Sequence, residues 1–434
     1  MTSSPRMLFL REGKTNRVVE NFLKRPAFDA EAERAATETL ARIRSGGAQA
    51  LVECARRFDG VELSPSRLRV TEAEFKAAAG QVDRAFKTAV REARTRIRAF
   101  ARAGLRRDWS IQTPGGGQVG ERFIALDRVG VYVPGGQAPL ASTALMTAAL
   151  AQTAGVPEIV ACTPCRKDAS IDPHVLFALR AAGATEVYRL GGIQAIGLMA
   201  YGTNRIRKVR KIVGPGGAYV TAAKRHVYGH VALDLVAGPS EIAILADAKA
   251  SARCVAADLL SQIEHGTGHE KALLATDSPA LARAVQKECV AQAAGLSRAD
   301  FVFRVMNRGM LIAVTETLQA GMDLCNRFAP EHFELLVERP RTWVRRVRAA
   351  GAVFLGPWSP ESAGDFVAGP SHVLPTGGAA AMFSGLTADD FRRRTSVIAF
   401  TRRDLEQTLP AIETFGRVEQ LDGHARSARM RFES

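Results

Sequence analysis

The most constraining feature of this sequence is an alternation of short β-branched runs, glycine-rich turns and helical stretches. It starts near Arg128, where VGVYVPGG is followed by STALMTAALAQTAG, and it recurs through EIVACTP and EVYRLGG. A second series begins after Gly238-Pro239 with EIAILAD and KALLATD, each again followed by a helical stretch. Strands that alternate with helices in this way form βαβ units around a largely parallel sheet. The sequence therefore predicts an α/β protein with two Rossmann-like parallel-sheet domains.

Two further helical stretches precede this alternation. Residues 29–44 are rich in Ala, Glu and Arg, and Gly46-Gly47 follows them as a helix stop. The sequence Thr71-Glu-Ala-Glu74 is a capping box, whose first and last side chains satisfy backbone N–H groups at the start of a helix. The apolar period after it runs toward Phe100 and predicts one long helix.

The end of the chain has a different pattern. After about Phe383 the sequence is short of strand signals, and it closes with the Arg-rich helical segment HARSARMRF. We therefore expect a helical tail outside the two α/β domains. The predicted division is a helical N-terminal region (1–120), a first α/β domain (121–238), a second α/β domain (239–382) and a C-terminal tail (383–434).

Composition argues against several classes of protein. The chain has 434 residues, of which 47% are hydrophobic and 24% charged, as in ordinary globular domains. No apolar run reaches the roughly 18 residues of a membrane span, and the run Met7–Leu10 is too short for the core of a signal peptide. We therefore expect a cytoplasmic protein with no membrane partner.

The formal net charge of +15 raises the alternative of a nucleic-acid-binding protein. The basic residues are spread through predicted helices such as REARTRIRAFARAGLRR, with few aromatic residues between them to stack on bases. A solvated basic surface is the preferred interpretation, so we expect no nucleic-acid partner. The alternative predicts tight binding that weakens steeply with salt.

A G-x-G-x-x-G pattern is present at Gly115, Gly117 and Gly120. In a dinucleotide-binding domain this pattern must follow a strand and open a helix. Here it follows Pro114 and runs into the predicted strand 129–133, so its context is wrong. Glycine-rich turns such as 134–136 or 214–217 are better candidates for binding a nucleotide, because backbone N–H groups in turns can bind phosphate.

Two short segments carry residues suited to acid/base or metal chemistry. In LLSQIEHGTG, Gln262 and His265 are three residues apart and share one face of a predicted helix, which two glycines then end. In FAPEHFELL, Glu331 and His332 follow Pro330 at a turn before an apolar run. A carboxylate beside an imidazole can perform general acid/base work near neutral pH.

Two later segments add further candidates. The predicted Gly/Pro-rich loop PESAGDFVAGPSHVLPT holds Asp365 and His372, and the segment EQLDGH near the C-terminus holds Glu419 and His424. Loops that carry an isolated acid and imidazole are often functional. Zinc accepts nitrogen and oxygen ligands, and the candidates for it are Gln262, His265, Asp365 and His424. Their spacing leaves open whether they converge.

Seven segments of the sequence match the motifs of a known protein family. They are VGVYVPGG, KIVGPGGAYVTAAKRHVYG, DLVAGPSEIAILAD, ADLLSQIEHG, FAPEHFELL, ESAGDFVAGPSHVLPTGG and EQLDGHARSARMRF. In this order they resemble the successive motifs of the histidinol dehydrogenase family, from about residue 120 to the end of the chain. The resemblance implies a zinc-dependent, NAD-linked homodimer that oxidises L-histidinol to L-histidine in two successive steps, with one Zn²⁺ per subunit.

The resemblance also assigns roles to residues, each by its place in a matching motif. The implied zinc ligands are Gln262, His265, Asp365 and His424, the last of them from the partner subunit, so that the active sites are shared across the dimer. The implied acid/base pair is Glu331 and His332. The implied substrate positions are Ser240, Gln262, His265, His332, Asp365, His372, Glu419 and His424. The implied NAD positions are Tyr132, Gln194 and Gly217.

The chemistry of this family suits these residues. Oxidation of an alcohol to a carboxylate needs two hydride removals with a water added between them, so His332 suits the proton acceptor and Glu331 the activator of water. Three positions depart from the family pattern, since Gly217 and Ser371 stand where Asn is usual and Ala381 where Arg is common. The alternative is a related zinc/NAD polyol dehydrogenase that acts on another alcohol, such as a sulfonated diol.

Overall fold

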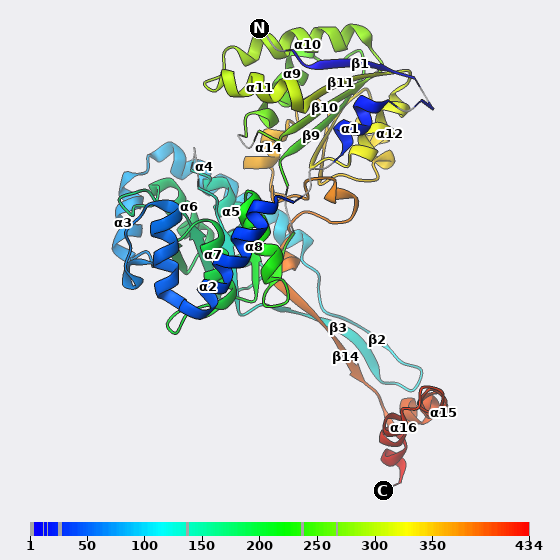
Figure 1. Cartoon of the computed structure of the whole chain (residues 1–434). Coiled ribbons are helices and arrows are strands. Elements are labelled where there is room, and N and C mark those ends of the chain that lie inside the picture. The colour runs from blue at the N-terminus through cyan, green and yellow to red at the C-terminus, as the bar shows by residue number, and fades with distance from the viewer. Residues whose placement is uncertain are drawn as a thin grey trace.

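The computed structural model describes residues 4–11, 13–14, 16–24, 28–135, 139–235, 238–265 and 268–433. Two parallel sheets form two domains, and a three-stranded antiparallel arm extends away from them (Figure 1). The arm carries the helices α15 (Arg402–Val418) and α16 (Asp422–Arg429) at its far end (Figure 1). The predicted α/β fold with two Rossmann-like domains is confirmed. Within these ranges no helix is both long and apolar enough to cross a membrane.

The first sheet has the strand order β6-β5-β4-β7-β8, with all strands parallel. Its strands are β4 (Arg128–Tyr132), β5 (Glu158–Thr163), β6 (Glu186–Arg189), β7 (Lys211–Val213) and β8 (Ala232–Leu233), and its helices are α5 (Ala141–Thr153), α6 (Pro173–Ala182), α7 (Gly192–Tyr201) and α8 (Ala218–Val227). The chain reverses direction across the sheet between β4 and β7. Doubly wound sheets bind ligands at the carboxyl edge of such a switch point.

The second sheet repeats this order as β11-β10-β9-β12-β13. Its strands are β9 (Glu241–Ala246), β10 (Lys271–Thr276), β11 (Met310–Thr315), β12 (His332–Leu336) and β13 (Ala352–Leu355), and its helices are α9 (Ala252–Ile263), α10 (Pro279–Ala293), α11 (Ala299–Gly309), α12 (Leu318–Phe328), α13 (Pro340–Trp343) and α14 (Glu361–Phe366). One strand is added to it from the start of the chain. β1 (Arg6–Leu10) pairs in parallel with β11, so region 1–120 is not wholly helical as expected.

Both faces of the second sheet are covered by apolar residues. Along β9, Ile242 and Ile244 join one hydrophobic cluster, whereas Ala243 and Leu245 join the other. A strand that is buried on both faces needs apolar residues at every position, which produces the continuous apolar runs seen in the sequence. The same two-sided burial holds for β4 of the first sheet, all of whose residues are buried.

Four helices precede the first sheet: α1 (Arg17–Leu23), α2 (Ala30–Cys54), α3 (Glu72–Gln81) and α4 (Arg84–Gly104). The predicted capping box is confirmed, because Thr71 and Glu74 exchange side-chain and backbone hydrogen bonds at the start of α3. One expected boundary is confirmed and another is wrong. Gly47 has a non-helical backbone, with φ of 55° and ψ of −134°, so two helical segments meet at a kink there within α2. The predicted long helix after Thr71 is two helices, because Asp83 caps a new one at α4.

The arm consists of β2 (Trp109–Gln112), β3 (Gln118–Ala125) and β14 (Arg392–Ala399), paired in the order β14-β3-β2. The expectation of a tail short of strands is therefore wrong for β14. This strand begins with three arginines, and nearly all of its residues are exposed. A strand without a buried face has no alternation of apolar and polar residues, so the signal by which strands are recognised is missing.

In the G-x-G-x-x-G pattern, Gly115 and Gly117 lie at the turn between β2 and β3, and Gly120 lies within β3, so the pattern belongs to a hairpin and not to a strand-to-helix turn. The carboxylate of Asp404 accepts hydrogen bonds from the backbone N–H groups of Gly115, at 2.7 Å, and Gly117, at 2.9 Å. A Cβ atom at either glycine would collide with Asp404. Gly115 and Gly117 therefore allow α15 to pack closely against the hairpin.

We expect the substitution Asp404→Asn to loosen this docking. Burial opposes ionisation of Asp404, but hydrogen bonds from Thr401, Thr113 and Gly115 outweigh it and lower the pKa of the carboxyl well below its usual range. Such a group stabilises the fold above the usual carboxyl pKa, and this contribution is lost as the pH falls. Hydrogen exchange at neutral pH should show faster exchange of the Gly115 and Gly117 amides in the variant. Glu406→Gln, an exposed change on the same helix, is the control, and equal exchange in both variants would contradict the assignment.

Candidate active site

The centre of the site lies where β12 begins, at the amino edge of the second sheet. α12 ends at Phe328, and Ala329 then takes a left-handed conformation with φ of 48°. Pro330 follows and cannot continue a helix. Glu331 therefore lies directly before β12 and His332 is the first residue of this strand, and both side chains are buried.

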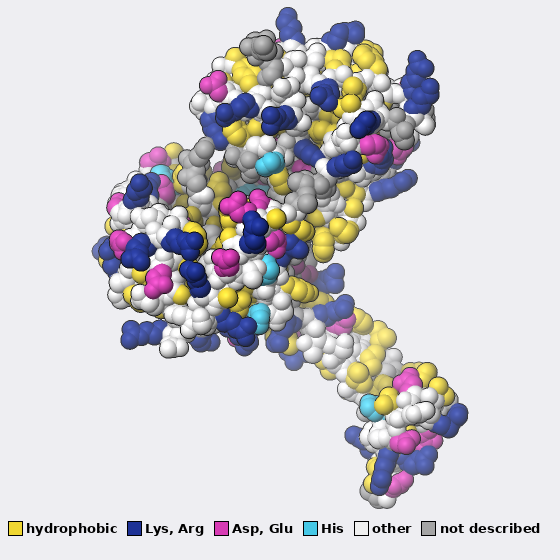
Figure 2. Space-filling view, viewed as in Figure 1, with side chains coloured by type: hydrophobic (Ala, Val, Ile, Leu, Met, Phe, Trp, Pro, Cys, Tyr) yellow, Lys and Arg dark blue, Asp and Glu magenta, His cyan; other side chains and the backbone are white. Residues whose placement is uncertain are grey.

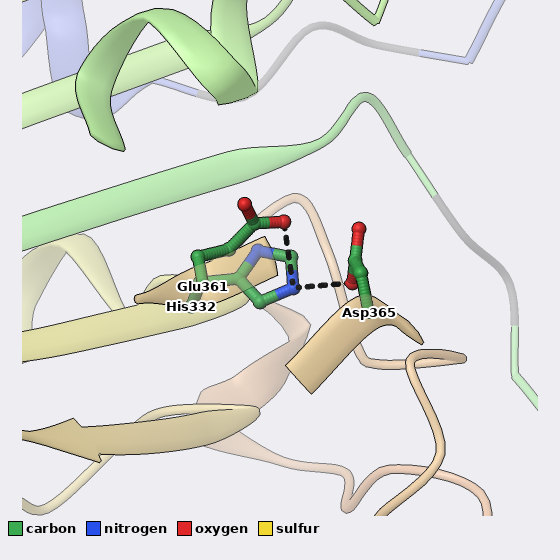
Figure 3. Close-up of side chains that lie close together, drawn as sticks. All are labelled: His332, Glu361 and Asp365. Atoms are coloured by element: carbon green, nitrogen blue, oxygen red, sulfur yellow. Dashed lines mark ion pairs between the residues drawn. The ribbon is translucent and has the colours of Figure 1, made fainter. Parts of the chain in front are cut away.

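The imidazole of His332 has a fixed orientation. Its Nδ1 lies 2.9 Å from Oε1 of Gln262 and 3.2 Å from the backbone oxygen of Glu241. Both neighbours are acceptors, so Nδ1 carries the hydrogen and Nε2 is the nitrogen left for chemistry. Nε2 faces two carboxylates, at 3.6 Å from Oδ1 of Asp365 and 3.9 Å from Oε1 of Glu361 (Figure 3).

The end of α9 supplies the amide that orients this imidazole. Gln262 is fully buried in the last turn of α9, and its Nε2 lies 3.4 Å from Nδ1 of His265 just beyond the helix. The predicted neighbourhood of Gln262 and His265 is therefore present. His265 itself is exposed, so its imidazole stands at the rim of the cluster.

α14 carries two carboxylates into the cluster, and one of them was missed from the sequence. Glu361 and Asp365 lie four residues apart on this helix and therefore share a face. The segment was expected to be a loop, and that expectation is wrong at Glu361–Phe366, since the backbone is helical there. Had the four-residue spacing been considered as helical, Glu361 would have been found beside Asp365.

Glu361 is held in place by two neighbouring elements. Its Oε2 accepts a hydrogen bond of 3.0 Å from the hydroxyl of Ser261 on α9, and its backbone N–H donates to Oε1 of Glu334 at 2.8 Å. Glu334 is itself buried and shares a hydrogen bond with Asp258. Burial raises the pKa of both carboxyls, and the charge of Asp258 raises that of Glu334 further, whereas the shared hydrogen bond by itself lowers the pKa of Asp258. Glu334 and Asp258 could not be identified from the sequence, because each is the only acidic residue of its strand or helix.

The buried charges shift one another's ionisation. Burial raises the pKa of Glu331 to about 7 and that of Glu361 to about 8. Burial disfavours the charged form of His332, but the carboxylates of Glu331 and Asp365 outweigh it and raise its pKa to about 9. Burial likewise opposes ionisation of Asp365, yet the neighbouring imidazoles hold its pKa below the usual range. The cluster is therefore a carboxyl-rich pocket around one imidazole, in which each group shifts the ionisation of the others.

This pocket fits a metal ion. His332, Glu361 and Asp365 each offer one ligand atom, and these atoms lie within 4.8 Å of one another. Nε2 of His332 and Oε1 of Glu361 are buried without a hydrogen-bond partner, which is costly unless another group completes them. Nitrogen and carboxylate oxygen are the donors that zinc prefers. The predicted ligands Gln262, His265 and Asp365 adjoin the same space.

Two predicted substrate positions also reach the cluster. The hydroxyl of Ser240 hydrogen-bonds the carboxylate of Glu331. His372 lies with Nδ1 at 3.0 Å from the backbone oxygen of Asp365 and with Nε2 at 3.2 Å from the hydroxyl of Thr143. Since Thr143 belongs to α5, His372 connects the cluster to the first domain. Thr143 was not anticipated from the sequence.

The three predicted NAD positions gather at the carboxyl edge of the first sheet. Tyr132 ends β4, and its hydroxyl accepts a hydrogen bond of 3.2 Å from the N–H of Gly192 at the start of α7. Gln194, in the first turn of α7, is buried and donates to Asp59 at 2.7 Å. Gly217 precedes α8, and a Cβ atom there would meet nothing within 4 Å. The space in front of α8 is therefore open.

Two predicted residues lie far from the cluster of their own chain. Glu419 follows α15 and His424 lies in α16, so both are carried at the far end of the arm (Figure 1). Both are exposed. Of the twelve predicted site residues, seven adjoin the His332 cluster and three lie at the carboxyl edge of the first sheet, whereas Glu419 and His424 belong to neither group in this chain.

Comparison with known proteins identifies the family. The family model described as histidinol dehydrogenase matches residues 23–432. The chain belongs to the histidinol dehydrogenase family. The histidinol dehydrogenase of Heliobacterium mobile is 42% identical over 415 residues, covering 95% of this chain and 97% of that protein. That of Geobacillus kaustophilus is 44% identical over 403 residues, covering 93% and 94%.

A solved structure of the family has the same fold. The crystal structure of histidinol dehydrogenase from Elizabethkingia anophelis superposes with a TM-score of 0.94 at 32% identity, covering 99% of this chain and 98% of that one. Histidinol dehydrogenases are oxidoreductases that carry out the NAD-linked oxidation of histidinol to histidine in histidine biosynthesis. The resemblance inferred from the motifs is therefore confirmed.

We expect His332→Gln to lower turnover by about 10²–10⁴-fold, which is the usual effect of losing a general base. The amide keeps the polar contact to Gln262 but cannot accept a proton. Zinc content, measured on the purified variant, should equal that of the wild type, because the predicted ligands remain. His174→Gln, a change on α6 of the first domain, is the control. Loss of zinc together with activity would instead make His332 a metal ligand.

Proposed function

We propose that this chain oxidises L-histidinol to L-histidine through bound L-histidinal, with one zinc ion per subunit held by Gln262, His265, Asp365 and His424 of the partner subunit. The observation that supports this most directly is the carboxyl-rich pocket around the buried, unpartnered Nε2 of His332. It lies at the edge of the second sheet that faces the first domain, where Tyr132, Gln194 and Gly217 would bind NAD.

Each residue of the pocket has a separate task in this proposal. His332, oriented through Nδ1, takes the proton of the substrate hydroxyl at Nε2. Glu331, whose pKa is raised to about 7 by burial, activates the water that adds to the aldehyde. When bound, zinc would hold the amine and imidazole of the substrate and offset the carboxylate charge around His332, and NAD would accept the two hydrides.

The charge of the pocket favours the proposed substrate over the alternative one. L-histidinol is a cationic amine, and the pocket has three carboxyl groups, Glu331, Glu361 and Asp365. A sulfonated diol would bring a negative charge into the same buried space, where repulsion is weakly screened. Glu419 of the partner subunit would add a further carboxylate beside the substrate's imidazole.

The nucleic-acid alternative gains no support from the molecular surface. On the face shown in Figure 2, Lys and Arg side chains are dispersed over both domains and the arm, with acidic and apolar side chains between them. A nucleic-acid-binding surface requires a continuous basic groove or stripe. We therefore propose a small-molecule substrate and no nucleic-acid partner.

The direct test is a product balance. Purified protein loaded with zinc should convert L-histidinol to L-histidine and form two NADH per histidine, because the reaction removes two hydrides. Chelation should abolish NADH formation and added zinc should restore it. Formation of NADH from a sulfonated diol, with none from L-histidinol, would favour the alternative substrate class.

We also propose a homodimer in which residues 383–434 reach the neighbouring subunit. The arm exposes large apolar side chains, namely Ile111, Val397, Ile398, Phe400, Phe415 and Val418, and Figure 2 shows apolar side chains gathered along it. Such a surface on a projecting element indicates a protein interface. Glu419 and His424 at its end would then enter the cleft of the partner.

Mixing two inactive variants tests this exchange. His265→Ala and His424→Ala should each be inactive alone. In a heterodimer, one site collects both defects and the other collects neither, so one site per heterodimer should regain activity. Heterodimers formed by partial unfolding and reassembly can be isolated with two different affinity tags. If verified heterodimers stay inactive, each chain completes its own site.

A further inference from the structure

The turn that follows β7 is held by a buried ion pair. The backbone N–H of Gly214 donates to Oδ2 of Asp234 at 2.7 Å, and the backbone oxygen of Gly214 accepts from Nζ of Lys224 at 3.0 Å. Lys224 and Asp234 also pair directly with each other, and their side chains are only 2% and 1% exposed. Both polar atoms of one peptide residue are thus bound by the two members of a single ion pair.

A buried ion pair of this kind contributes little net stability to a domain. Removal of two charges from water costs several kcal/mol per ion, and apolar residues of similar size often give equal or greater stability. Neither Lys224 nor Asp234 takes part in the proposed reaction. Their effect is to fix the position of Gly214, which apolar side chains in their place would leave without partners.

Gly214 occupies a place where small displacements matter. Its φ is +118°, a conformation that side-chain-bearing residues rarely adopt, and a Cβ atom there would collide with the backbone oxygen of Tyr132. Gly214 therefore packs its backbone directly against the end of β4. The contact lies between β4 and β7, which is the switch point of the first sheet.

The same ion pair also fixes the helix that follows. Gly214 opens the turn Gly214-Pro-Gly-Gly217, and α8 begins at Ala218 with no side-chain hydrogen bond at its N-cap. Lys224 lies in the last turn of α8 and reaches back to Gly214, while Asp234 follows β8. The pair thus connects the turn, the helix and the neighbouring strand. Helix starts of this kind bind the phosphates of dinucleotides.

We propose that Lys224 and Asp234 are positioning residues for NAD: they hold Gly214 and the start of α8 so that the backbone N–H groups of Gly216, Gly217 and the first turn of α8 face the pyrophosphate. The inference rests on the proposed function in that the ligand of this edge is NAD. Neither side chain touches the cofactor, since both lie behind the turn and are buried. Their contribution is to affinity for NAD and not to the chemical step.

The test compares binding of each ligand separately. Lys224→Met keeps the aliphatic stem but removes the donor to Gly214, and loss of such a charged hydrogen bond should weaken NAD binding by about tenfold or more. Calorimetric titration of NAD into the zinc-loaded protein, without L-histidinol, measures this directly. Zinc content, the KM for L-histidinol and kcat at saturating NAD should stay within about twofold of wild type, because the chemical cluster is in the other domain.

Two further variants keep the proposal open to refutation. Lys224→Gln offers a neutral donor to Gly214 and should recover part of the NAD affinity lost in Lys224→Met. Asp234→Asn keeps the partner size but loses the charge, and it decides the question if Lys224→Met does not fold. Arg225→Gln is the matched control, because Arg225 is the next residue of α8 and pairs with Glu33 at the surface.

The outcomes separate this inference from the proposed function. If the wild-type protein binds no NAD, the proposed cofactor is wrong. If the wild type binds NAD and the folded Lys224 and Asp234 variants bind it equally well, the positioning role is overturned. The same conclusion follows if affinity for zinc, L-histidinol and NAD falls in parallel with melting temperature, since the pair would then support the fold as a whole.

Discussion

Glu331 and Glu361 are buried, and Asp365 is partly buried, around the imidazole of His332, where water screens their charge poorly. Like charges at such distances raise one another's energy unless protons or a cation offset them. Without a bound cation, the pKa values of Glu331, Glu361 and His332 are all raised, so that protons reduce the repulsion between the carboxylates. A metal ion and a cationic substrate, both part of the proposed function, would offset the same carboxylate charge.

The two sheets serve this arrangement with opposite edges. The first sheet offers its carboxyl edge, where α8 begins with no side-chain hydrogen bond at its N-cap and where NAD is proposed to bind. The second sheet offers its amino edge, where β12 begins with His332. His372, bonded to both Asp365 and Thr143, joins these edges. The relative position of cofactor and substrate therefore depends on a contact between domains and not on either sheet alone.

Much of this architecture was readable from the sequence. Apolar runs such as EIAILAD predicted parallel strands because each such strand is buried on both sides, and the three-residue spacing of Gln262 and His265 predicted their contact. Features without a local signal were missed. β14 is exposed along its length, and Glu361 stands in a segment whose Gly and Pro content indicated a loop. The convergence of α9, β12 and α14 depends on tertiary packing, which spacing along the chain does not encode.

The pairing of β1 with β11 has a consequence for synthesis on the ribosome. Arg6 pairs with Leu311, so roughly 300 residues separate the two partners, which at typical elongation rates is about 15–60 s of translation. During this interval the five strands of the first sheet are completed, since all of them precede residue 234. The apolar segment Met7–Leu10 is made well before β11, and β11 has an unpaired edge until β1 pairs with it. β1 is thus synthesised long before the strand beside which it lies.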